Sequence, residues 1–234
     1  MTNIINPTTT NESVVKTLRS LMPARVLSYN EALQRAELQA SRLLSLHQIT
    51  APAVPIEVVT EQPRIRIVQS YDLPVSGSAH WDGRYWVVTL NAAEYDLRQR
   101  FSTLHEYKHI IDHPTRHLIQ GDPRSKLSAE QMAEKVADYF AACVLMPKAW
   151  VKSAFCSETQ SIEKLAGKFR VSPKAMSYRL SQLGLTEPVD RCATNIAPTS
   201  RSRLTRRAGS SRRSYFRTMS TSQPSTSIPT GVLT

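Results

Sequence analysis

The apolar residues of this 234-residue chain recur with two different periods, and the changes between them predict its elements. Residues 28–49 carry apolar side chains three and four positions apart, which is the period of an amphipathic helix. Ser28 and Glu31 form a capping-box pair at the start of this helix. The same period predicts helices over residues 14–22, 95–112, 128–146 and, as a short pair, 161–185, with a loop over 114–127.

Strands are predicted between the first two long helices. Residues 64–70, "RIRIVQS", alternate apolar and polar side chains. Residues 78–91, "SAHWDGRYWVVTLN", have the pattern of a β-hairpin with Asp82-Gly83 at a type I′ turn. Together the elements predict an α+β fold, in which a small antiparallel sheet lies beside the helices.

The positive charge of the chain is concentrated at its C-terminal end. The formal net charge is +11, yet the residues from Arg191 onward contain eight arginines and neither lysine nor acidic residues. Seventeen of these 44 residues are Ser or Thr. The segment 1–190 then holds 22 basic and 19 acidic residues, a net charge of +3. We expect a disordered basic tail, which either binds the phosphates of nucleic acid or is an extension without function.

Other features of the composition predict a soluble cytoplasmic protein without a membrane partner. The three cysteines are far apart and form no CxxC pair, which argues against a zinc ribbon or a disulfide framework. The N-terminal segment has neither the basic nor the apolar region of a signal peptide. No apolar run approaches the length of a membrane span.

The segment "FSTLHEYKHIIDH", residues 101–113, concentrates the candidate chemistry. His105 and His109 stand four residues apart, so on a helix they lie on adjacent turns of one face and are able to bind one metal ion. Glu106 projects from the same turn and is placed to take a proton from water as that water attacks a carbonyl. Zinc lowers the pKa of such a water towards 7, so hydroxide is available at neutral pH. The motif predicts one zinc ion per chain and hydrolysis of peptide bonds; manganese or another divalent ion is the alternative metal.

A catalytic zinc site needs a third protein ligand. The metzincin spacing is excluded, because Asp112 and Thr115 stand where it requires glycine and histidine. The remaining candidates are His113, one turn further along the same helix, and Glu134 on the next helix. We favour Glu134, because a straight helix does not bring three successive turns onto one ion. Asp138, four residues later, is placed to accept a hydrogen bond from a ligand histidine and to fix its ring.

These residues resemble those of the ImmA/IrrE family of zinc metallopeptidases. "RQRFSTLHEYKHIIDH" followed by "AEKVADYFAACVLMP" is similar to the family's arginine and phenylalanine lead-in, its HExxH motif and the helix that follows. The resemblance covers about residues 24–186, and it includes the Ser-Gly and hairpin region. The chain departs from the family at Tyr107-Lys108, often Leu-Gly, and at Val136, often acidic. The matching positions are Arg98, Arg100, Phe101, His105, Glu106, His109, Glu134, Ala137, Asp138, Phe140, Ala141, Leu145, Met146 and Pro147.

The resemblance implies both a fold and a function. It implies a zincin-like metallopeptidase domain with active-site helices, followed by a helical subdomain. Members of the family are often encoded in mobile elements or stress regulons beside helix-turn-helix repressors, which they inactivate by site-specific cleavage. The implied partner is therefore a protein substrate of that kind. The expected segments are 1–23 (N-terminal), 24–150 (metallopeptidase domain), 151–186 (helix-turn-helix-like subdomain) and 187–234 (disordered basic Ser/Arg/Thr-rich tail).

The C-terminal helix pair leaves a second function open. It resembles a helix-turn-helix whose second helix carries Lys174, Ser177, Arg179 and Gln182. The alternative is therefore a non-catalytic regulatory protein that binds DNA or a repressor through this segment. We favour packing on the peptidase domain or substrate docking, and the presence of Glu106, which a structural metal site does not need, favours catalysis.

Two further roles are expected around the metal. The hairpin is expected to present an edge strand to an extended peptide substrate. Candidates for stabilising negative charge in the transition state, or for the rim of the cleft, are His113, His117 and Tyr139.

Overall fold

The computed structural model describes residues 13–119 and 127–185 of the chain. The tail predicted over 187–234, for which nucleic-acid binding is one of two alternatives, lies outside these residues, as do residues 1–12 of the segment 1–23. The described elements are, in chain order, α1 (Val14–Arg19), α2 (Tyr29–Leu46), α3 (Glu57–Thr60), β1 (Ile65–Ser70), β2 (Gly77–Trp81), β3 (Trp86–Asn91), α4 (Asp96–Asp112), the 3₁₀ helix η1 (His113–Leu118), α5 (Ala129–Leu145), α6 (Lys148–Ser157), α7 (Ile162–Phe169) and α8 (Pro173–Gln182).

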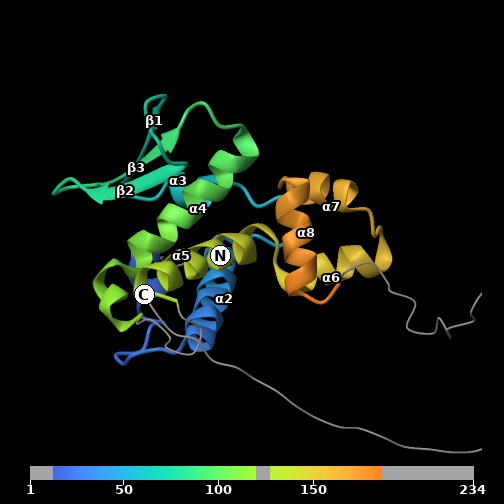
Figure 1. The fold of residues 1–234 in the computed structure, drawn as a ribbon, viewed down its shortest axis with the longest axis horizontal. Coiled ribbons are helices and arrows are strands. Elements are labelled where there is room, and N and C mark those ends of the chain that lie inside the picture. The colour runs from blue at the N-terminus through green and yellow to red at the C-terminus, as the bar shows by residue number, and fades with distance from the viewer. Residues whose placement is uncertain (1–12, 120–126, 186–234) are drawn as a thin grey trace, which may run out of the picture. The chain divides into compact units, whose positions relative to one another are not determined.

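The three strands form one mixed sheet in the order β1–β3–β2 (Figure 1). β2 is antiparallel to β3, and β1 is parallel to β3 with Ile65 beside Trp86. The prediction of an antiparallel sheet is therefore wrong for β1. Alternation of apolar and polar residues identifies a strand but does not specify its partner, and here the chain places β1 on the far side of β3 from β2.

The turn of the β2–β3 hairpin is longer than predicted. The backbone N–H of Asp82 donates to the Tyr85 carbonyl at 3.0 Å, and the Asp82 carboxylate accepts from the amides of Arg84 and Tyr85 at 2.7 and 2.5 Å. Of the two expected turn residues, only Gly83 has a positive φ, at 99°, whereas a type I′ turn needs both. The Asp82 carboxylate thus organises a four-residue connection in place of the two-residue turn.

Helix α4 lies between the sheet and the helices α2 and α5 (Figure 1). Alanines on α2 and α5 let the helices pack closely, and Ala36, Leu43, Leu104, Val136 and Phe140 are at most 1% exposed. The capping box predicted at the start of α2 is present, and a second complete capping box, Ser128 with Gln131, begins α5. Helix α4 is therefore enclosed on most of its sides: ten of its 17 residues are buried, and it contacts α5, β2, β3 and α1.

Beyond α5 the chain forms three shorter helices. Helix α8 begins after Ser172, whose side chain caps it, and Pro173 is its first residue. Arg179 on α8 is 1% exposed; its Nε donates to the Met146 carbonyl at 3.1 Å, and its Nη2 lies 3.4 Å from Cys143 Sγ. This buried guanidinium satisfies a carbonyl at the end of α5 and fixes α8 against it.

Three helical segments were not predicted: α3, α6 and η1. The last occupies much of the expected loop over 114–127, of which residues 120–126 lie outside the described part. Pro114 stands in the first turn of η1, where its missing N–H leaves no hydrogen bond unmade. No helix in the described residues is long and apolar enough to cross a membrane.

Candidate metal centre

Helices α4 and α5 bring two imidazoles and a carboxylate together. His105 Nε2 lies 3.0 Å from His109 Nε2 and 3.1 Å from Glu134 Oε2, and His109 Nε2 lies 3.3 Å from Glu134 Oε1. The two histidines come from adjacent turns of α4, as their spacing predicts, and Glu134 comes from the second turn of α5. Among the described residues, these three form the group of histidine, cysteine and acidic side chains close enough to hold a metal ion.

The spacing and chemistry of these three groups fit a metal ion. Four ligands at about 2.0–2.1 Å from a zinc ion stand about 3.3 Å apart, close to the separations found here. His105 Nδ1 lies 2.9 Å from Asp138 Oδ1, and a carboxylate only accepts, so Nδ1–H is the donor. In the neutral form of the ring the lone pair is then on Nε2, which faces the carboxylate of Glu134. Because the lone pairs of Nε2 and of the carboxylate oxygens face each other, a cation between these groups is favoured.

The protonation of the two histidines is set by their surroundings. Burial lowers the pKa of His105, but the hydrogen bond and the charge of Asp138 outweigh it and hold this pKa above its ordinary value. Burial also lowers the pKa of His109, and the charge of His105 lowers it further. Asp138 therefore raises the pKa of His105 and is not among the groups that shift the pKa of His109.

Glu106 is buried between α4 and the edge strand. It is 8% exposed, and burial raises the pKa of its carboxyl group. A Cβ atom built on Gly77 of β2 would stand 3.1 Å from Glu106 Cγ and 3.2 Å from Oε1. Only a residue without a side chain leaves the strand so close to this carboxylate. The sheet edge and the glutamate thus share one wall of the site.

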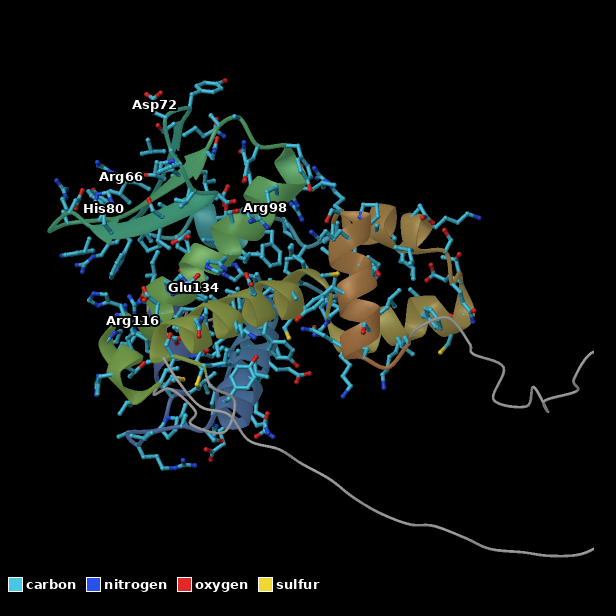
Figure 2. All side chains as sticks on the ribbon, viewed as in Figure 1. Arg66, Asp72, His80, Arg98, Arg116 and Glu134 are labelled. Atoms are coloured by element: carbon cyan, nitrogen blue, oxygen red, sulfur yellow. The ribbon has the colours of Figure 1, made fainter. Side chains whose placement is uncertain are left out.

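The four side chains open onto a cleft of about 680 Å³. β2 and the residues before it form one side, and α4 and α5 form the other. Two cationic side chains line the cleft, Arg98 from α4 and Arg116 from η1, and Glu134 lies between them in Figure 2. Arg98 donates to Ser76 Oγ at 3.0 Å, whereas Arg116 is exposed and contributes to the low pKa of His109.

The three candidates for transition-state or rim roles, His113, His117 and Tyr139, do not line this cleft. The His113 ring stands edge-on to Trp86, with centroids 4.9 Å apart, and His117 is exposed on η1. Tyr139 donates to Glu37 Oε2 at 3.3 Å, on the side of α5 turned towards α2. Sequence reasoning missed Arg116 and Gly77. The glycine of the Ser-Gly segment was the available signal, whereas the position of Arg116 depends on the unpredicted helix η1.

The opposite side of α4 carries a buried polar network. Lys108 is 1% exposed, and its Nζ donates to Asp112 Oδ1 at 2.5 Å and to Gln39 Oε1 at 2.7 Å. Gln39 Nε2 in turn donates to the Leu18 carbonyl at 3.0 Å. At this departure from the family's usual glycine, the buried lysine is part of a network that ties α1 and α2 to the helix that carries the histidines.

Comparison with known proteins places this fold in a family. A solved Mycobacterium tuberculosis transcriptional regulator has a similar fold, with a TM-score of 0.52 at 17% sequence identity. The match covers 73% of this chain and 52% of that chain, so this chain spans about half of the regulator's length. A search of the curated proteins gives no match. Residues 60–181 match the peptidase M78 family, described as the IrrE N-terminal-like domain. The match covers 122 of the 234 residues and includes every residue that lines the cleft. The chain therefore belongs to that family.

Proposed function

We propose that this chain is a zinc-dependent endopeptidase of the ImmA/IrrE type, which cleaves a helix-turn-helix transcriptional repressor in the cytoplasm. The observation that carries the proposal is the convergence of His105, His109 and Glu134 on one point, with Glu106 open to the same cleft beside a sheet edge. His105, His109 and Glu134 would hold the metal. When bound, zinc supplies Lewis acidity, which makes water a stronger acid at neutral pH and polarises the scissile carbonyl.

The roles of the other groups follow from their places in the cleft. Glu106 takes a proton from water as the water oxygen forms a bond to the carbonyl carbon, and passes it to the amide nitrogen as the C–N bond breaks. Asp138 holds the His105 ring in the orientation that presents Nε2. Arg116 is the cation that faces the negative charge developing on the carbonyl oxygen.

The substrate is an extended segment of a protein. Among the described residues β2 pairs with β3 alone, and residues of β2 line the cleft, so a peptide laid there gains main-chain hydrogen bonds with the other edge of β2. A fold similar to that of a transcriptional regulator supports a role in gene regulation. DNA binding by α8 is disfavoured, because Arg179, one of its expected base-reading residues, is buried against the end of α5.

The metal content of the purified full-length chain tests the proposal. After reconstitution with zinc and dialysis, the wild type and Glu106→Gln are expected to hold about one zinc per chain, and His109→Ala close to none. His80→Ala, which removes an exposed histidine of β2, is the matched control and is expected to match the wild type. Each protein is then incubated with a lysate of its host, the organism that encodes it. Mass spectrometry identifies the new protein N-termini that form. No zinc in the wild type, or no new N-terminus from a zinc-loaded wild type, contradicts the proposal.

Gly77→Ala is expected to lower kcat about tenfold or more with little effect on folding. The added methyl group pushes on Glu106 Cγ and Oε1, and a displacement of about 1 Å in a catalytic group can cost up to about a hundredfold in rate. The measurement compares single-turnover cleavage rates and thermal unfolding. Gly167→Ala on α7, whose Cβ would meet no atom within 4 Å, is the control and should leave the rate unchanged. Equal rates for wild type and Gly77→Ala would show that the strand does not position Glu106.

A further inference from the structure

A second groove, of about 870 Å³, opens beside the catalytic cleft between α8 and the helices α4 and α5. Its lining is largely apolar, with Phe101, Leu145 and Met146 at its floor and the half-buried Ala175 on the α8 side. Three residues line both the groove and the cleft: Arg98, Phe101 and Asp138, of which Arg98 is labelled in Figure 2. The groove is therefore continuous with the site that holds the candidate metal ligands.

Both walls of the groove are fixed. Arg179 joins α8 to the Met146 carbonyl at the end of α5, and Arg170, in the turn before α8, donates to Asp96 Oδ2 of α4 at 3.0 Å. Helix α8 is therefore held against α5 by Arg179 and joined to α4 by the exposed pair Arg170–Asp96, and these two contacts define the walls of the groove.

Exposed aromatic side chains stand in the groove. Tyr95 is 59% exposed and Tyr178 is 66% exposed, and both line it. Tyrosine is one of the residues that are enriched at the sites that contribute most to protein binding, and these two do not pack in the core of their own chain. The charged residues of the lining are two acids and two bases, Glu94 and Asp138 with Arg98 and Lys174, so the groove does not attract the phosphates of nucleic acid.

The length of the groove matches a few residues of an extended peptide. Along α5, Asp138 stands four residues and Met146 twelve residues beyond Glu134, which corresponds to about 6 and 18 Å of helix. An extended peptide spans about 3.3 Å per residue. A substrate whose scissile bond lies at Glu134 therefore places residues about two to five positions away in the groove.

We propose that this groove is a docking site for the protein substrate, which receives an aromatic or large aliphatic side chain about two to five residues from the scissile bond. The inference rests on the proposed peptidase function and specifies what it selects. α8 then serves in substrate selection, with Ser177, Tyr178 and Ser181 turned towards the bound segment.

The test uses full-length, zinc-loaded Glu106→Gln protein as an immobilised trap for a degenerate decapeptide library. The retained peptides are sequenced by mass spectrometry, and we expect them to be enriched in Phe, Tyr, Trp, Leu and Met. Adding Ser177→Trp, an exposed position of α8 that faces the groove, is expected to lower their retention about tenfold. Adding Ser153→Trp, an exposed serine on α6 that does not line the groove, is the matched control and should retain the same peptides as the trap. Tyr178→Ala is a second variant and should weaken retention of the aromatic peptides.

Several results would overturn the proposal. An unchanged set of peptides with Ser177→Trp, or retention without apolar enrichment, would show that the groove does not bind substrate. Decapeptides copied from residues 187–234 are added to the library. If these are retained in preference to the others, the groove binds a segment of this chain and not a substrate. A dimer in light scattering that Ser177→Trp disrupts would assign it to a second copy. Retention as expected, with no cleavage by the wild-type chain, would leave the groove in place and contradict the peptidase function alone.

Discussion

Replacement of Glu106 by glutamine is expected to lower the rate of peptide-bond cleavage by about 10²–10⁴-fold, the usual contribution of a general base. Glutamine keeps the size of the side chain, so its fit against Gly77 is preserved, but its amide does not accept a proton from water. The carboxylate is not one of the three groups whose donor atoms converge, so zinc content is expected to stay at about one per chain. Loss of rate with retention of metal separates a base from a ligand.

The measurement follows the appearance of new N-termini in the host lysate, with each variant loaded to the same zinc content. Glu61→Gln, an exposed glutamate after α3, makes the same chemical change away from the cleft and should not alter the rate. A Glu106→Gln protein as active as the wild type would show that another group takes the proton. A Glu106→Gln protein without zinc would mean that Glu106 is needed for zinc binding, and this would contradict its role as the general base.

The parts of the site that could be predicted are those that local sequence specifies. The four-residue spacing of His105 and His109 determines that they share a helix face, and α4 has nearly the expected bounds. Glu134 and Asp138 are spaced in the same way on α5, and the structure brings both within hydrogen-bond distance of His105. Their roles as metal ligand and orienting group stay predictions until metal is measured. Such pairs are predictable because a helix converts spacing into geometry.

The parts that could not be predicted depend on contacts between distant segments. The parallel pairing of β1 with β3 and the four-residue turn after Asp82 are two of these. Arg179 and Lys108 are two more, because a charged residue on a helix is usually exposed, and only tertiary structure supplied the carbonyl of Met146 and the side chain of Gln39 as partners. The docking groove depends on the same contacts, since Arg179 places α8.

The buried pair Lys108–Asp112 is expected to have the largest effect on stability. Asp112→Ala should lower the free energy of unfolding by about 3–5 kcal/mol, because it leaves the Lys108 ammonium group buried without its counter-ion. Desolvation already lowers the pKa of Lys108, and the charge of Asp112 opposes that shift. The double variant Lys108→Met, Asp112→Ala should be more stable than Asp112→Ala alone, since it removes the unpaired charge together with its partner.

Chemical denaturation of the four proteins of this double-mutant cycle measures the coupling. Glu158→Ala, which removes a carboxylate from the half-exposed pair with Lys168, is the control and should lower stability by less than about 1 kcal/mol. Additive losses in the cycle would show that Lys108 and Asp112 do not depend on each other. A strong coupling would show that the buried ammonium group depends on the Asp112 carboxylate, and because both residues lie on the helix that carries the histidines, the destabilised variants should also hold zinc more weakly.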